Sequence, residues 1–409
     1  MLTRTLTTWR RPLSVAGRKA WKAKVAGTAW LEFDRPAWVY RSRGAVPSVD
    51  LEFRQPEVVS PEHLALCERL LAAYWLAREG APGGSGMWSS ELFAERQQVL
   101  SSALQRRDPE SLATALAAMF RSDFIIGIAG GSLGTGRQTA LGRRFTRLYI
   151  LNKLVALAES QGVVRTENPE QGTPGIAFSQ GTEALVEGIE KRLGIALDFP
   201  EVGAAYGLLA AGRLVTSDAP DQVYGALRLR DAIATFLKET DRPPTVVEIG
   251  AGYGAMAYWF LQLVDARYTI IDLPAVNVLQ GYFLAQAMGT GAVSFLGEPP
   301  ARVTILPAHA LETVEVPFDV LANKDSMPEM PSIALEEYLA WGARNCRGIF
   351  YSYNQEAAAP FEGTAQNVVS ESVERLGGFQ RLRRDASWLR RGYVEELYRP
   401  LGERATPGD

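Results

Sequence analysis

The most regular pattern of apolar and polar positions lies in residues 245–274. Residues 245–249 (TVVEI) form a β-branched run, which is typical of a strand buried on both faces of a parallel sheet. Residues 255–264 carry large apolar side chains at helical spacing, and residues 268–271 form a second apolar run. The pattern therefore predicts a strand, a helix and a second strand.

The alternation continues to the C-terminus. Helical spacing over residues 275–288 and apolar runs at 303–306, 318–322 and 348–353 predict an α/β fold with an open, mostly parallel, Rossmann-like sheet. The last two runs, residues 379–383 and 393–398, are about nine residues apart. Because such a connection is too short for a crossover helix, we expect a C-terminal antiparallel hairpin.

The first half of the chain predicts helices instead. We expect them to begin near Ser60 and to lie near residues 90–104, 109–120, 139–161 and 182–195, after an irregular or short-stranded segment at 31–58. The glycine-rich residues 127–137 predict a connector or a lid. We expect a mainly helical N-terminal domain at 1–205, which covers the ligand crevice or makes a homodimer, and a ligand-binding domain at 206–409.

Composition narrows the class of protein. A formal charge of −3 gives no reason to expect nucleic acid as a partner, and no apolar run approaches the roughly 20 residues of a membrane span. The two cysteines, Cys67 and Cys346, are far apart, which argues against a disulfide scaffold or a zinc cluster. We expect a cytoplasmic enzyme. The basic residues 1–30, which contain no acid, favour a partly ordered arm over a transit peptide.

A turn rich in glycine follows the first strand of the central unit. Gly250, Gly252 and Gly254 allow a ligand to approach the backbone at a helix N-terminus. Asp272 stands 20 residues after Gly252 (272 − 252), where nucleotide folds place the acid that binds ribose hydroxyls. A dinucleotide fits the spacing, but Glu248, two residues before the first glycine, suits an ammonium group better than a phosphate.

The pattern E-x-G-x-G-x-G at residues 248–254 resembles motif I of the class I S-adenosylmethionine-dependent methyltransferases. Together with FDVLANKDSMPEMP (318–331) and FYSYNQEA (350–357), residues 231–409 resemble the putative sugar O-methyltransferase family of bacterial biosynthetic clusters. This resemblance implies that S-adenosylmethionine is the cofactor and that a hydroxyl of a sugar or sugar-like molecule is methylated in secondary metabolism. It also implies the class I fold, in which a terminal hairpin completes the sheet. The methylated atom, oxygen, nitrogen or carbon, stays open, as does a nicotinamide-dependent oxidoreductase.

The resemblance also implies a set of site residues after the strands. For the cofactor we expect Glu248, Gly250, Ala251, Gly252, Gly254, Asp272, Leu273, His309 and Asn323. For the acceptor we expect Asp325, Ser326, Glu329, Asn354 and Gln355.

An alcohol must lose a proton during methylation, so a base within reach would help. Asp325 is our first candidate, followed by Glu329 and then by His309, whose place after the third strand also suits an adenine contact. Asp325 is alternatively the N-cap of a helix. We expect no metal, because the sequence has no Asp-Asp pair.

Overall fold

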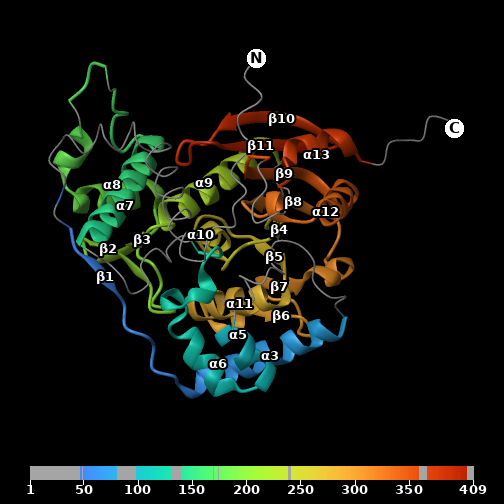
Figure 1. Cartoon of the computed structure of the whole chain (residues 1–409). Coiled ribbons are helices and arrows are strands. Elements are labelled where there is room, and N and C mark those ends of the chain that lie inside the picture. The colour runs from blue at the N-terminus through green and yellow to red at the C-terminus, as the bar shows by residue number, and fades with distance from the viewer. Residues whose placement is uncertain are drawn as a thin grey trace, which may run out of the picture.

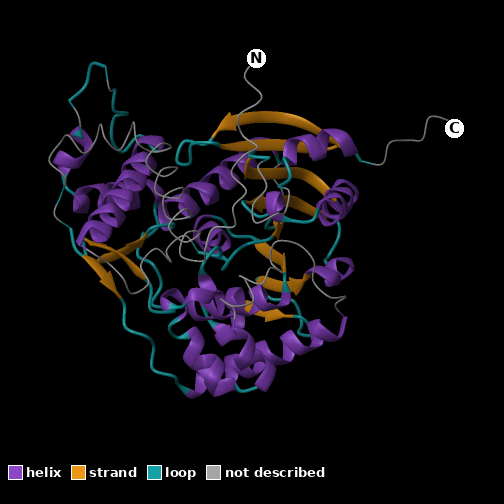
Figure 2. Cartoon of the chain, viewed as in Figure 1, coloured by secondary structure: helices purple, strands orange, loops and turns teal. Residues whose placement is uncertain are grey.

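An eight-stranded sheet crosses the computed structural model, which describes residues 47, 49–80, 98–129, 140–168, 170–173, 175–237, 241–358 and 366–402 (Figures 1 and 2). The expected basic arm at 1–30 lies outside these residues. The strands are β4 (Thr245–Ile249), β5 (Arg267–Asp272), β6 (Val293–Phe295), β7 (Val303–Pro307), β8 (Phe318–Lys324), β9 (Cys346–Gln355), β10 (Phe379–Ala386) and β11 (Tyr393–Pro400).

The strand order is β10-β11-β9-β8-β4-β5-β7-β6. All neighbours from β9 to β6 are parallel, whereas β11 runs antiparallel to both β9 and β10. The predicted mostly parallel sheet with a C-terminal antiparallel hairpin is therefore confirmed. In such a sheet the carboxyl ends of β4, β5, β7, β8 and β9 meet at one edge, where ligands bind.

Helices cover both faces of the sheet because successive strand residues point to opposite sides. Val246 and Ile270 pack with helices α9 (Ala219–Phe236), α10 (Ala255–Leu263) and α11 (Pro274–Met288), while Val247 and Ile271 pack with α12 (Ser332–Asn345) and α13 (Val369–Leu376). The apolar runs of the sequence are buried on both faces for this reason.

The preceding residues form helices α3 (Pro61–Gly80), α5 (Gln98–Arg106), α6 (Pro109–Leu116), α7 (Ala140–Ser160) and α8 (Thr182–Leu193). α3 packs on α11, and α7 packs on α9 (Figure 1). Three expectations fall partly outside the described residues: the irregular or short-stranded segment at 31–58, of which 47 and 49–58 are described, the helix near 90–104, of which α5 is the described part, and the glycine-rich stretch 127–137, described only to Ala129.

A second, three-stranded sheet was not predicted. β1 (Leu51–Phe53) pairs antiparallel with β2 (Tyr206–Ala210), which pairs antiparallel with β3 (Arg213–Thr216). This sheet joins segments on both sides of residue 205, where we divide the chain by pattern. No helix of the described part of the chain is long and apolar enough to cross a membrane.

Candidate functional site

The glycine turn follows β4 at the carboxyl edge of the sheet. Gly250, Gly252 and Gly254 have φ angles of +71°, +60° and +90°, a region that residues with a Cβ rarely adopt. A Cβ on Gly250 would lie 2.0 Å from Ser326 Oγ, and one on Gly252 would lie 3.0 Å from the carbonyl oxygen of Ile128. A Cβ on Gly254 would lie 2.8 Å from Leu284 Cδ1, so all three glycines combine a positive φ with a close neighbour.

Asp272 lies next to this turn, at the end of β5. Its carboxylate accepts hydrogen bonds from the backbone N–H of Leu273 (2.7 Å) and from Gln280 Nε2 (2.6 Å). Burial raises the pKa of Asp272 to about 7, although Leu273, Gln280 and the backbone N–H of Ala251 oppose the shift. The Leu273 side chain beside it is 38% exposed, which leaves an apolar surface next to the carboxylate.

Glu248 is the second acid of the predicted cofactor site. Its side chain is buried against the sheet, where Tyr268 Oη donates a hydrogen bond to Oε2 (2.9 Å). Burial raises the pKa of Glu248 to about 7. Two carboxyl groups therefore lie at the ends of β4 and β5 close to the turn, and such acceptors suit ammonium and hydroxyl groups of a ligand better than phosphates.

Two amides connect the ends of β4, β8 and β9. Asn323 Nδ2 donates to the carbonyl oxygen of Ile249 and to Ser326 Oγ (both 2.7 Å), and Asn354 Nδ2 donates to Asn323 Oδ1 (2.9 Å). Asn354 Oδ1 accepts from the backbone N–H of Asp325 (3.0 Å). Both predicted amides are brought to the site, where they hold the backbone of neighbouring segments.

Asp325 is not a helix N-cap. It has a φ angle of +74°, and Ser326 is the N-cap of the short 3-10 turn Met327–Glu329 instead. A positive φ is unusual for a residue other than glycine, and here the backbone N–H of Asp325 is held by the carbonyl oxygen of Tyr353 (3.0 Å) as well as by Asn354. The carboxylate forms an ion pair with Arg390.

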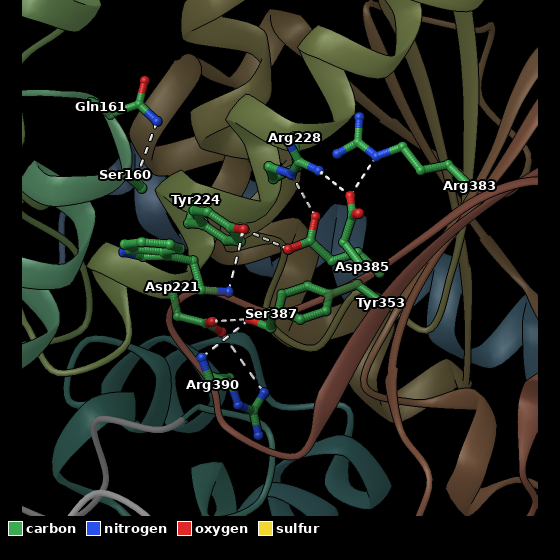
Figure 3. A network of polar contacts seen from close by, with 12 residues as sticks. Ser160, Gln161, Asp221, Tyr224, Arg228, Tyr353, Arg383, Asp385, Ser387 and Arg390 are labelled. Atoms are coloured by element: carbon green, nitrogen blue, oxygen red, sulfur yellow. Dashed lines mark hydrogen bonds and ion pairs between the residues drawn. The ribbon is translucent and has the colours of Figure 1, made fainter. Parts of the chain in front are cut away.

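A buried charge cluster adjoins Asp325 through Arg390, and Figure 3 shows three of its members, Asp221, Tyr353 and Arg390. Asp221 Oδ2 is 2.6 Å from Lys324 Nζ and 3.8 Å from a guanidinium nitrogen of Arg390, and Asp221 Oδ1 accepts a hydrogen bond from Tyr353 Oη (2.9 Å). Burial alone would raise the pKa of Asp221, but the charges of Lys324 and Arg390 outweigh it and lower the pKa to about 2. Our sequence interpretation missed this cluster.

Glu329 lies near Asp325, but its carboxyl group, unlike that of Asp325, is not ion-paired with Arg390. Burial raises its pKa to about 7, the charge of Asp325 raises it further, and Arg390 opposes the shift. Its carboxyl group accepts no hydrogen bond from the described residues. Gln355, by contrast, is bonded to Gln366 (3.1 Å).

His309 lies on the other side of the site. It is exposed in the 3-10 segment Ala308–Thr313 after β7, and a Cβ on Gly80, at the end of α3, would lie 2.7 Å from its Nε2. Two strands, β5 and β4, separate β7 from β8, so about 14 Å of sheet lies between the two strand ends. The structure therefore does not bring His309 to Asp325 and Glu329.

Tyr253, within the glycine turn, is a further residue that sequence reasoning missed. It is buried, its hydroxyl donates to Asp218 Oδ2 (2.6 Å), and its ring packs edge-on against Phe120 (5.2 Å) and Phe283 (4.9 Å). In the sequence, a single tyrosine between glycines gives no indication that it anchors the turn to Asp218, Phe120 and Phe283. Among the described residues no group of three or more His, Cys, Asp or Glu side chains is placed to hold a metal.

No protein-family model and no curated protein matches the sequence. Several solved structures are similar to it. The mitomycin 7-O-methyltransferase MmcR is 13% identical over 95% of this chain and 100% of its own, with a TM-score of 0.35. The pyocyanin biosynthetic protein PhzM is 15% identical over 76% and 94%, with a TM-score of 0.33. A 1,6-didemethyltoxoflavin-N1-methyltransferase of Burkholderia thailandensis is 18% identical over 44% and 77%, also with a TM-score of 0.33. The order and directions of the strands, a mostly parallel sheet completed by an antiparallel hairpin, are those that the resemblance to class I methyltransferases implies.

Proposed function

We propose that this chain is an S-adenosylmethionine-dependent O-methyltransferase that methylates a hydroxyl of a sugar or sugar-like small molecule. One observation carries the proposal: the glycine turn after β4 and the carboxylate of Asp272 after β5 meet at the ends of adjacent parallel strands. This is the arrangement that binds an adenosine ribose next to a close backbone approach.

The residues present fit this cofactor. Asp272 would accept hydrogen bonds from the ribose hydroxyls, and Leu273 offers an apolar surface to the adenine, with His309 on the same side. The backbone of Gly250, Ala251 and Gly252 would contact the amino-acid part, with Gly254 closing the turn. Glu248, buried in β4 two residues before the turn, is the acid that would favour a ligand with an ammonium group, and Asn323 fixes the turn through the carbonyl oxygen of Ile249.

The cofactor, when bound, would supply a methyl group activated by a sulfonium. The side chains then have to orient the acceptor, exclude water and remove a proton from the acceptor hydroxyl. Asp325 was our first candidate for the base, but its carboxylate is already engaged in an ion pair with Arg390. Glu329, with a pKa of about 7, suits proton removal near neutral pH, and we propose it as the base.

A hydroxyl-rich acceptor is supported by the polar groups after β8 and β9. Asp325, Ser326, Glu329 and Arg390 present acceptors and donors that suit the alternating hydroxyls of a sugar or cyclitol. We propose that these residues, with Asn354 and Gln355 behind them, define the acceptor side.

Calorimetry with S-adenosylmethionine tests the cofactor. We expect micromolar binding that Asp272→Ala or Gly250→Val removes, the latter because a side chain would collide with Ser326. Retained binding in both variants would contradict the proposal. Methyl transfer is then tested with labelled cofactor on a panel of sugars and cyclitols, and mass spectrometry locates the methyl group on oxygen, nitrogen or carbon.

A nicotinamide-dependent oxidoreductase is the second candidate, favoured by the G-x-G-x-x-A spacing of residues 250–255. Against it, the sheet ends in an antiparallel pair beyond β9, where a dinucleotide fold continues with parallel strands. A fluorescence titration with NADH distinguishes the two, because only the oxidoreductase predicts a saturable signal.

A further inference from the structure

Gln280 connects the two halves of the cofactor site. It lies fully buried on α11, and its Nε2 donates hydrogen bonds to Asp272 Oδ2 (2.6 Å) and to the carbonyl oxygen of Gly252 (3.0 Å). These two acceptors fix the orientation of the amide, because the flipped orientation would place Oε1 against two oxygens.

The carboxylate of Asp272 is thereby held by donors on both oxygens. Leu273 N–H holds Oδ1 and Gln280 holds Oδ2. A carboxylate accepts at about four lone-pair positions, so it still has room for ligand hydroxyls. With its rotation fixed, it would bind a ribose without losing further conformational freedom.

The polarity of Gln280 is unusual for its surroundings. Its helical neighbours Leu279, Tyr282 and Phe283 are buried and mostly apolar, and its own Oε1 has no hydrogen-bond partner among the described residues. An unpaired buried oxygen is unfavourable, so a leucine or methionine of similar size would pack at lower cost. A leucine or methionine at this position would, however, lose the two hydrogen bonds that Gln280 donates to Asp272 and Gly252.

We propose that Gln280 is a positioning residue that holds the ribose-binding carboxylate of Asp272 in register with the glycine turn, so that both contact one adenosine ligand. This inference rests on the proposed function. It concerns a residue that touches the cofactor only through Asp272 and Gly252, and it predicts that ribose recognition depends on position 280.

Binding measurements on the full chain test it. We compare Gln280→Leu with Gln286→Leu, a matched control on the same helix whose amide oxygen lies 3.2 Å from His63 Nε2. The probes are S-adenosylhomocysteine, adenosine and 2′,3′-dideoxyadenosine. We expect Gln280→Leu to bind S-adenosylhomocysteine about tenfold more weakly or worse, and to lose the preference for adenosine over the dideoxy analogue. The control variant should behave like the wild type.

The pH dependence gives an independent readout. We expect the affinity for S-adenosylhomocysteine to rise with pH as Asp272 ionises. The Gln280 hydrogen bond lowers the pKa of Asp272, so removing this bond should move the rise in affinity to higher pH. Gln280→Glu, which keeps the size of the side chain, should move it further in the same direction, because a second carboxylate disfavours the ionisation of Asp272. This second variant keeps the test open if Gln280→Leu does not fold.

The outcomes separate the two proposals. A wild type that binds none of the three probes would refute the proposed function. A wild type that binds them, while Gln280→Leu or Gln280→Glu keeps normal ribose preference and pH dependence, would overturn the role of Gln280. Equal weakening for both nucleosides without a pH shift would also overturn it, because it indicates only a disturbed helix.

Discussion

Replacing Lys324 with methionine removes one partner of a buried ion pair. The side chains of Lys324 and Asp221 are 5% and 10% exposed, with 2.6 Å between Nζ and Oδ2. Loss of one partner from such a pair typically destabilises a protein by about 3–5 kcal/mol, since the other charge stays buried. Asp221 keeps the Tyr353 hydroxyl at 2.9 Å and Arg390 at 3.8 Å, so we expect the lower end, about 3 kcal/mol.

The pKa of Asp221 gives a similar magnitude. A decrease from its ordinary value of 3.8 to about 2 corresponds to about 2 kcal/mol of stabilisation of the charged form. Because the folded pKa is lowered, this stabilisation is complete above pH 4 and is lost as pH falls toward 2. In Lys324→Met the burial of Asp221 is less well compensated, so its pKa should be lowered less. The decrease in unfolding free energy between pH 4 and pH 2 should therefore be smaller than in the wild type.

Urea unfolding of four proteins measures this coupling: wild type, Lys324→Met, Asp221→Leu and the double variant. The double variant should be more stable than the sum of the single losses predicts, by about 2–3 kcal/mol, because neither charge is left unpaired. Single losses below about 1 kcal/mol that simply add would refute the reasoning, since they are typical of solvated pairs.

Three further predictions concern the site. If Glu329 is the base, the rate of methyl transfer should increase with pH through about 7. Glu329→Gln should lower kcat by about 10²–10⁴-fold and flatten this pH dependence, and a variant with the pH–rate profile of the wild type would exclude this role. Affinity for S-adenosylhomocysteine should also rise with pH through about 7 as Asp272 ionises, and Asp272→Asn, measured by calorimetry, should bind weakly at every pH; a pH-dependent Asp272→Asn would contradict this. Gly254→Ala should destabilise the protein by about 1–3 kcal/mol in thermal unfolding, because φ is +90° and a Cβ would lie 2.8 Å from Leu284 Cδ1; an unchanged Tm would show that the turn relaxes easily.

The sheet could be predicted from the sequence because its strands are buried on both faces. Residues 245–249 were placed correctly to the residue, and β5, β7, β8 and β9 within a few residues. A continuous apolar run between glycines or prolines has few alternatives in an α/β pattern. Leu273 and the glycine turn follow from the strands, so their placement could be predicted too.

The second sheet could not be predicted for a local reason. β1 has three residues and β3 has four, and β1 finds its partner about 150 residues later in the chain. Runs so short show no clear period, and pairing across that distance depends on tertiary packing. β6, with three residues, was missed for the same reason.

The charge cluster was missed because its members come from three separate segments. Asp221 lies at the start of α9, Lys324 at the end of β8, and Arg390 between β10 and β11. In the sequence each of them looks like a solvated charge. The alternative interpretation of Asp325 as an N-cap was wrong for a related reason: contacts from Asn354 and Arg390 hold Asp325 in a conformation that local sequence does not favour.

The glycine turn is held by contacts from both halves of the chain. From the C-terminal half, Ser326 after β8 lies against Gly250, and Gln280 on α11 bonds the carbonyl oxygen of Gly252. From the N-terminal half, the Ile128 carbonyl oxygen approaches Gly252, while Phe120 packs against Tyr253 within the turn. A turn of this kind consists mostly of glycine and has little side-chain packing of its own. Its shape must therefore come from its neighbours, so the contacts that fix it cross the boundary that pattern places at residue 205. The helical half thus contributes to the geometry of the cofactor site itself, in addition to any role in covering the crevice.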